Sequence, residues 1–226
     1  MGKRQEIRKR RNQKVARQQR MVLAIVLIFA IVITAIIVIQ SLKPVGEIKP
    51  LVAHNRAQTE GLTMGDPNAP ITVEEFSDFQ CVACSQWWQG YEQDFIDKYV
   101  ATDKVYYIYR PFSFIGPESL RAAEAAYCAN DQGEFWPYHD MLFSNWNGEN
   151  VGNFSDDRLI AFGTSIGLNE KEFKACLSSN KYESEVKQGV VYGNQKGLQG
   201  TPSFLINDQK LVNAGELYST LDAIIK

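Results

Sequence analysis

The longest uninterrupted apolar stretch of the chain lies near its start. Residues 21–39, MVLAIVLIFAIVITAIIVI, contain no charged residue, no proline and no glycine, and Thr34 is their only polar member. As a helix rising about 1.5 Å per residue they would span roughly 28 Å, close to the hydrocarbon thickness of a bilayer. A core helix would show a polar face, and a cleaved signal peptide would have a shorter apolar region with a small-x-small site. The pattern therefore predicts an uncleaved transmembrane helix.

The segment after this helix, residues 40–65, shows no apolar periodicity. It contains five breakers: Pro44, Gly46, Pro50, Gly61 and Gly65. We expect a mostly irregular linker here, in which His54 is a solvated residue.

The rest of the chain alternates strand-like and helix-like patterns. A β-rich run at 71–76, a helical stretch from about 81 to 99 and a second strand at 104–110 come first. Helix candidates follow at about 118–130, 134–145, 155–166, 169–179 and 181–196, and then strands at 203–207 and 210–213 and a helix at 216–225. The order β-α-β, a helical block, then β-β-α predicts an α/β fold with a helical insertion.

Charge gives the predicted membrane helix a direction. The net charge of −2 averages two opposite regions, because residues 1–20 carry nine bases and one acid, whereas the remainder carries 15 bases and 25 acids. Lys and Arg beside a first membrane helix stay on the cytoplasmic side. Residues 1–20 are therefore predicted to be a cytoplasmic tail and the body to lie outside the cytoplasm. A basic nucleic-acid-binding arm is the alternative, but the acidic body argues against nucleic acid as a partner.

Two cysteines lie between a predicted strand and a predicted helix, in Cys81-Val82-Ala83-Cys84. A structural zinc site usually needs four Cys or His ligands, often from paired C-x-x-C units. The next cysteine is 44 residues further on and no second C-x-x-C exists, so we expect no metal. A permanent structural disulfide and a redox-active pair are the two other interpretations.

The position at a helix start favours the redox interpretation. Unpaired backbone N–H groups and the helix dipole stabilise a thiolate on Cys81. A thiol of low pKa is a good leaving group, and its disulfide is correspondingly oxidising. Cys84 lies one helical turn further on the same face, where it can close the ring or resolve a mixed disulfide.

Two further positions are candidates for the same chemistry. By strand alternation Glu75 shares a face with Ile71 and Val73. It is either a solvated acid at a strand end or a partly buried acid that accepts the proton of Cys84. For Thr201-Pro202 the frequency of cis X–Pro bonds, about 5–6%, predicts a trans peptide.

Five segments together make the sequence resemble a known family. They are GDPNAP (65–70), VEEFSDFQCVAC (73–84), YRPFSF (109–114), AAYCANDQGEFWPYHDMLF (125–143) and GLQGTPSFLIN (197–207). This combination resembles the DsbA-like branch of the thioredoxin superfamily over about residues 63–226. The resemblance implies a thioredoxin fold at 66–226 with a helical domain inserted at about 112–190.

The resemblance also implies a role for each candidate residue. Cys81 would be the attacking cysteine and Cys84 the resolving one. Glu75 matches the family's buried acid, and Pro202 matches its cis-proline beside the C-x-x-C. The backbone of Thr201 could then pair with an extended substrate peptide by strand addition.

The dipeptide between the cysteines departs from the best-known oxidases of the family. Val82-Ala83 lacks the histidine found there, which would add charge stabilisation to the thiolate. The helix terminus is then expected to be the main source of stabilisation of the thiolate.

Cys128 and Cys176 both fall in helical patterns of the inserted block. Outside the cytoplasm such a pair is expected to be bridged, and family members resembling this chain carry a disulfide at matching places. A bridge closing a loop of 48 residues would stabilise the fold by about 4 kcal/mol. A second redox pair and two buried thiols are the alternatives.

These features predict a membrane-anchored thiol-disulfide oxidoreductase without a cofactor. It would form disulfides in reduced or misoxidised extracytoplasmic proteins and, as the resemblance implies, be reoxidised by a membrane partner of the DsbB or VKOR type. A reductase or isomerase using the same pair is the close alternative. A non-enzymatic chaperone module that holds client peptides at Thr201-Pro202 is the alternative from a different functional class.

Overall fold

The computed structural model describes residues 2–41 and 46–225, which belong to two units, Met1–Val45 and Gly46–Lys226. The first unit is the helix α1 (Gly2–Ser41). Its part Arg17–Ile36 is long and apolar enough to cross a membrane. The hydroxyl of Thr34 donates to the carbonyl oxygen of Ala30 at 2.8 Å, so this polar group is satisfied within the helix. The predicted N-terminal apolar helix is therefore confirmed.

The second unit is built on one mixed sheet with the strand order β1-β2-β4-β3-β5-β6. The strands are β1 (Thr59–Glu60), β2 (Thr63–Met64), β3 (Ile71–Ser77), β4 (Val105–Pro111), β5 (Ser203–Ile206) and β6 (Lys210–Asn213). The central strand β3 runs parallel to β4 and antiparallel to β5. Every residue of β3 except Thr72 is buried, because both faces of the sheet are covered.

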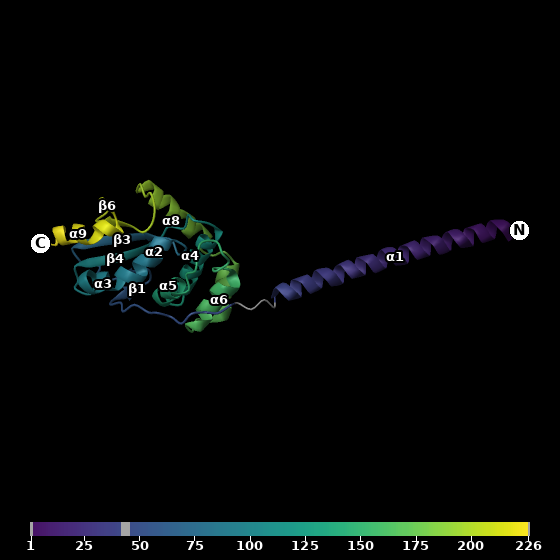
Figure 1. The fold of residues 1–226 in the computed structure, drawn as a ribbon, viewed down its shortest axis with the longest axis horizontal. Coiled ribbons are helices and arrows are strands. Elements are labelled where there is room, and N and C mark those ends of the chain that lie inside the picture. Colours follow the sequence, from purple (N-terminus) through teal and green to yellow (C-terminus); the bar gives the residue numbers. More distant parts are fainter. Residues whose placement is uncertain (1, 42–45, 226) are drawn as a thin grey trace. The chain divides into compact units, whose positions relative to one another are not determined.

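The helix that follows β3 starts after Cys81 and continues without a break to Val100. Its segments are α2 (Val82–Trp87), η1 (Trp88–Glu92), α3 (Gln93–Phe95) and η2 (Ile96–Val100), where η marks a wider π turn. The last helix, α9 (Ala214–Ile224), begins with a capping box between Asn213 and Glu216. In Figure 1, α9 lies beside β6.

The helical insertion consists of five helices between β4 and β5. They are α4 (Pro117–Asn130), α5 (Phe135–Ser144), α6 (Asp156–Ser165), α7 (Glu170–Ser178) and α8 (Glu183–Gln195), and they gather at one end of the sheet (Figure 1). A disulfide joins Cys128 of α4 to Cys176 of α7, with Cα atoms 5.9 Å apart. Helices appear where apolar periodicity predicts them, each within a few residues of the expected bounds.

Residues 42–45 of the mostly irregular linker expected at 40–65 lie outside the described residues, and two short strands interrupt the rest of it. Strands β1 and β2 form an antiparallel pair, and β2 extends the sheet by pairing with β4. Both strands have only two residues, which is too short for an alternating pattern to be read from sequence.

Residues 46–56, which we call the strap, are bound to the domain by side chains. The backbone N–H of Lys49 donates to Asn145 Oδ1 at 2.8 Å, and that of His54 donates to Asp140 Oδ2 at 2.9 Å. The prediction that His54 is a solvated linker residue is wrong. Its ring stacks on Trp88 at 5.1 Å between centroids. Side chains rather than a backbone ladder hold the strap, so it leaves no periodic signal.

Candidate active site

The loop after β3 places the two cysteines at the start of the long helix. Cys81 is the N-cap residue of α2, with an extended backbone and no side-chain cap, so the first N–H groups of the helix point freely towards its end. The preceding turn is fixed by the buried carboxylate of Asp78, which accepts hydrogen bonds from Gln80 N at 2.8 Å and Ser119 Oγ at 2.7 Å. Both cysteines are thiols here, with Cys84 fully buried and Cys81 8% exposed.

The pKa values of the two thiols are shifted in opposite directions. The thiol of Cys84 hydrogen-bonds to Cys81 and lowers the pKa of Cys81 to about 6 against the opposing effect of burial, with further help from the N–H groups of Ala83 and Cys84. Burial, and then the bond to Cys81, raise the pKa of Cys84 well above its usual value. The N–H groups at the helix terminus and the Cys84 thiol therefore both lower the pKa of Cys81.

Thr201 and Pro202 lie against the sulfur of Cys81. The peptide bond between them is cis, so the trans bond expected from the frequency of cis prolines is wrong, whereas the family resemblance implied the cis form. The Cys81 Sγ lies 3.4 Å from the carbonyl oxygen of Thr201. The turn leads directly into β5, whose Ser203 pairs with Phe76 of β3. The sheet thus brings together two segments about 120 residues apart in sequence.

Glu75 is a buried acid, only 2% exposed. Its Oε2 accepts hydrogen bonds from Trp87 Nε1 at 3.0 Å and from the hydroxyl of Tyr107. Burial, with a contribution from Glu92, raises the pKa of Glu75 well above its usual range. The interpretation of Glu75 as a solvated strand-end acid is therefore wrong.

Ser77 connects Glu75 with Cys84. Its hydroxyl lowers the pKa of both groups, and it is buried without a partner at full hydrogen-bond geometry among residues 46–225. The carboxylate of Glu75 is bonded to Trp87 and Tyr107 rather than directly to Cys84.

A group of buried charges lies on the far side of the same helix. His54, Glu92 and Asp140 each offer one ligand atom within 4.8 Å of the others, a spacing that could hold a metal ion. The guanidinium of Arg56 donates to both carboxylates, at 2.9 Å to Glu92 Oε2 and 2.6 Å to Asp140 Oδ2. A metal would have to displace this cation, which already pairs with both carboxylates. We call these four residues the charge cluster.

Sequence reasoning missed the charge cluster. One signal existed, since Asp140 lies in the apolar run FWPYHDMLF of α5, where a carboxylate needs a buried partner. No comparable signal marks Arg56, which lies in the segment expected to be an irregular linker.

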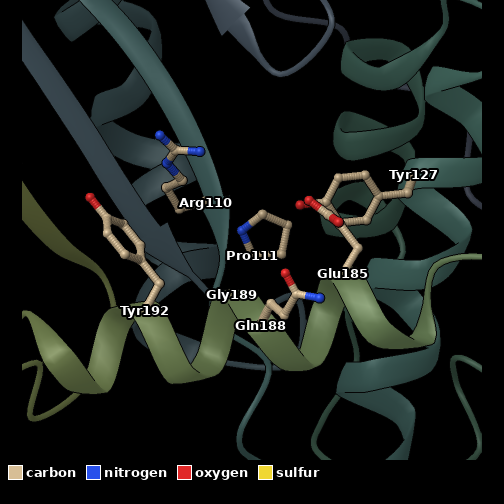
Figure 2. A pocket seen from close by; sticks show the side chains of 7 residues that line it. All are labelled: Arg110, Pro111, Tyr127, Glu185, Gln188, Gly189 and Tyr192. Atoms are coloured by element: carbon tan, nitrogen blue, oxygen red, sulfur yellow. The ribbon is translucent and has the colours of Figure 1, made fainter.

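One surface pocket lies apart from the cysteines. It has a volume of about 220 Å³. Arg110 and Tyr192 lie to one side of Pro111, and Tyr127 and Glu185 lie to the other (Figure 2). Arg110 is already paired with Glu74, with 2.6 Å between Nε and Oε2. None of the pocket-lining residues was predicted to be functional.

Comparison with known proteins identifies the class. A family model described as thioredoxin matches residues 57–226, so the chain belongs to the thioredoxin family. Of the curated relatives, a probable disulfide bond formation protein D from Bacillus cereus is 27% identical over 150 residues, which cover 64% of this chain and 69% of that protein. The structure of oxidised BdbD from Bacillus subtilis matches with a TM-score of 0.66 and 21% identity, covering 77% of this chain and 98% of that one.

A second kind of relative is much longer. The Na(+)/H(+) antiporter NhaA 3 of Salinispora tropica is 28% identical over 148 residues, which are 65% of this chain but 21% of the antiporter. The chain therefore spans about a fifth of the length of this relative. The thioredoxin fold with a helical insertion is confirmed, and the relatives include a protein named as a probable disulfide bond formation protein.

The low pKa of Cys81 predicts a specific pH dependence. In the reduced protein, alkylation of Cys81 by iodoacetamide should rise with a midpoint near pH 6, while buried Cys84 stays unreactive. A lowered folded-state pKa stabilises the reduced protein above the unfolded value of about 8.5. That stabilisation should disappear as the pH falls through about 6. A midpoint near 8.5 would contradict the assigned geometry.

Proposed function

We propose that this protein oxidises pairs of thiols in proteins outside the cytoplasm. The observation that carries the proposal is the asymmetric cysteine pair: an accessible Cys81 with a pKa of about 6 beside a buried Cys84 whose pKa is raised. A stabilised thiolate makes the reduced enzyme favourable, and so makes its disulfide a good acceptor of electrons. The lowered pKa of Cys81 supports oxidation, and the redox state of the pair in cells tests this against reduction or isomerisation by the same pair.

In the proposed reaction, a substrate thiolate attacks Cys81 Sγ of the Cys81–Cys84 disulfide. The bond between the two enzyme sulfurs breaks, and Cys84 leaves and takes up a proton from the protonated Glu75. A second substrate thiolate then attacks the substrate sulfur of the mixed disulfide, and Cys81 leaves as a stable thiolate. Two electrons pass from the substrate thiols to the enzyme pair, and the substrate gains one disulfide.

Substrate would bind beside Cys81 on the turn of Thr201 and Pro202. The support for this is the 3.4 Å approach of Cys81 Sγ to the Thr201 carbonyl oxygen. An extended peptide could add its backbone to this segment. Val82 is 45% exposed next to the reactive sulfur, and offers apolar contact to a partly unfolded client.

The proposed location rests on the N-terminal segment. The apolar part of α1 would anchor the protein, and the nine bases of residues 1–20 would keep that end in the cytoplasm. Reduced Cys81 and Cys84 would then be reoxidised by a quinone-linked membrane protein of the DsbB or VKOR type. Cys128 and Cys176, joined between two helices of the insertion, would serve as a structural disulfide.

Two labelling experiments in cells test the direction of the reaction and the location of the catalytic domain. Acid-quenched thiol trapping in intact cells tests the direction. We expect the Cys81–Cys84 pair to be mostly oxidised at steady state, and a mostly reduced pair would instead support a reductase or isomerase. After brief reduction of spheroplasts with dithiothreitol, a membrane-impermeant maleimide should label Cys81. Labelling only after detergent lysis would contradict the proposed topology.

A further inference from the structure

We propose that Arg56 is a positioning residue for the redox reaction, and that with Glu92 it sets the pH at which Glu75 exchanges a proton with Cys84. This inference rests on the proposed function, because it concerns the proton step of that reaction. It assigns a role in the active site to the strap, the segment that follows α1 in the chain.

Arg56 is a fixed, buried cation. Its side chain is 4% exposed. The guanidinium donates to both oxygens of Asp140, at 2.6 and 2.8 Å, and to Glu92 Oε2 at 2.9 Å. Its Cζ lies 4.6 Å above the ring of Trp136. With two carboxylates and an aromatic ring around it, the charge is held in one place.

The helix that starts at Cys81 connects this cation with the acid of the active site. Neighbouring residues of that helix bind the two sites, because Trp87 Nε1 donates to Glu75 at 3.0 Å and Trp88 Nε1 donates to Asp140 at 2.9 Å. Glu92 follows in the π turn η1 of the same helix. Glu75 and the charge cluster are therefore held by adjacent indoles on one rigid element.

Arg56 and Glu92 act on Glu75 in opposite directions. After burial itself, the negative charge of Glu92 raises the pKa of Glu75, whereas the positive charge of Arg56 lowers it. Although burial opposes its ionisation, the charge of Arg56 and the bond from His54 keep the pKa of Glu92 below its usual value. Both charges therefore persist across the neutral pH range, and act in a dry interior where screening is weak.

The other groups around Glu75 do not change charge in this range. They are the hydroxyl of Ser77 on the same strand, the indole of Trp87 on α2, and the hydroxyls of Tyr107 and Tyr109 on β4. From β5, the residue opposite Glu75 is the apolar Phe204. His139 packs on Tyr109, contacts Asp140 at 3.0 Å and acts on Glu92. Among the described residues, Arg56 and Glu92 are the charged side chains that act on the pKa of Glu75.

The step to be measured is the closure of the enzyme disulfide. Oxidised glutathione is added to the reduced full-length protein in detergent micelles, so that a glutathione mixed disulfide forms at Cys81. The Cys84 sulfur then attacks Cys81 Sγ, its proton passes towards Glu75, and glutathione leaves as a thiolate that takes up a proton. Acid quenching followed by mass spectrometry gives the rate of this closure as a function of pH.

Two single substitutions should shift the pH midpoint of disulfide closure in opposite directions. Arg56→Met removes the cation, so the pKa of Glu75 rises and the midpoint should move up by about one pH unit. Glu92→Gln removes the anion with little change of shape, and should move the midpoint down by a similar amount. Arg56→Lys keeps the charge and should stay close to wild type.

A purely structural role would not give opposite signs. If both variants shift in the same direction, or neither shifts, Arg56 and Glu92 do not control the proton step. If Arg56→Met fails to fold, the downward shift of the pH midpoint expected for Glu92→Gln still tests the proposal. The proposed function fails separately, when the wild type forms no mixed disulfide at Cys81 or when Cys81→Ser still exchanges at the normal rate.

Discussion

Replacing Cys81 with serine should reduce the oxidation of a reduced test protein to the rate of the uncatalysed reaction. Cys81 is the only one of the two active-site sulfurs in the described structure that combines exposure with a lowered pKa, because Cys84 is fully buried. A serine hydroxyl cannot form the mixed disulfide through which the electrons must pass. Reactivation of reduced, denatured ribonuclease A by the full-length protein measures this loss. Normal activity in the variant would contradict the proposed mechanism.

Cys84→Ala is the matched control, and its expected effect differs in kind. The attacking sulfur remains, so mixed disulfides should still form at Cys81, but the enzyme can no longer resolve them. Covalent adducts should accumulate in cells and disappear on treatment with dithiothreitol, and their mass identifies the clients. A wild-type cellular phenotype for Cys84→Ala and for the variant lacking both cysteines would favour a non-enzymatic client-binding protein instead.

Removal of the Cys128–Cys176 disulfide should give the largest change in stability. The bridge closes a loop with a sequence separation of 48 residues between α4 and α7. Restricting that loop in the unfolded chain is worth about 4 kcal/mol by the chain-entropy account. The variant Cys128→Ala/Cys176→Ala should lose free energy of unfolding on this scale, as measured by urea denaturation monitored by far-ultraviolet circular dichroism.

The same variant separates a structural disulfide from a second redox pair. Disulfide exchange at Cys81 should keep its normal rate below the new unfolding transition. A loss of turnover in the folded variant, or a Cys128–Cys176 pair that cycles between thiol and disulfide during the reaction, would contradict a structural role. The single substitution Cys128→Ala leaves one free thiol and should lose a similar amount of stability.

Glu75 shows where reading one strand at a time fails. Alternation correctly groups Glu75 with Val73, but it cannot say whether that face meets solvent. β3 lies between β4 and β5, and helices cover the sheet, so both alternating sets of residues are buried. Glu74 and Glu75 therefore lie in different buried environments, the first paired with Arg110 and the second bonded to Trp87 and Tyr107.

The strap shows a second limit. Its backbone is bonded to side chains of Asn145, Asp140 and Gln93, which lie between 38 and 96 residues away in the sequence. Such bonds impose no period on the strap itself, so its breakers and polar residues look like those of a free linker. Only the folded helices α5 and α3 bring these acceptors together.

The sequence by itself determined the features that depend on neighbouring residues. The apolar run of α1, the spacing of Cys81 and Cys84 at a helix start, and the order of strands and helices are all local patterns, read from side-chain periodicity and backbone preference. The tertiary structure decided the features that depend on distant residues. The cis bond at Pro202, the burial that raises the pKa of Cys84 and the burial of Arg56 beside Glu92 and Asp140 arise only when remote segments pack together. Removing these charges from water changes their energies far more than local sequence can indicate.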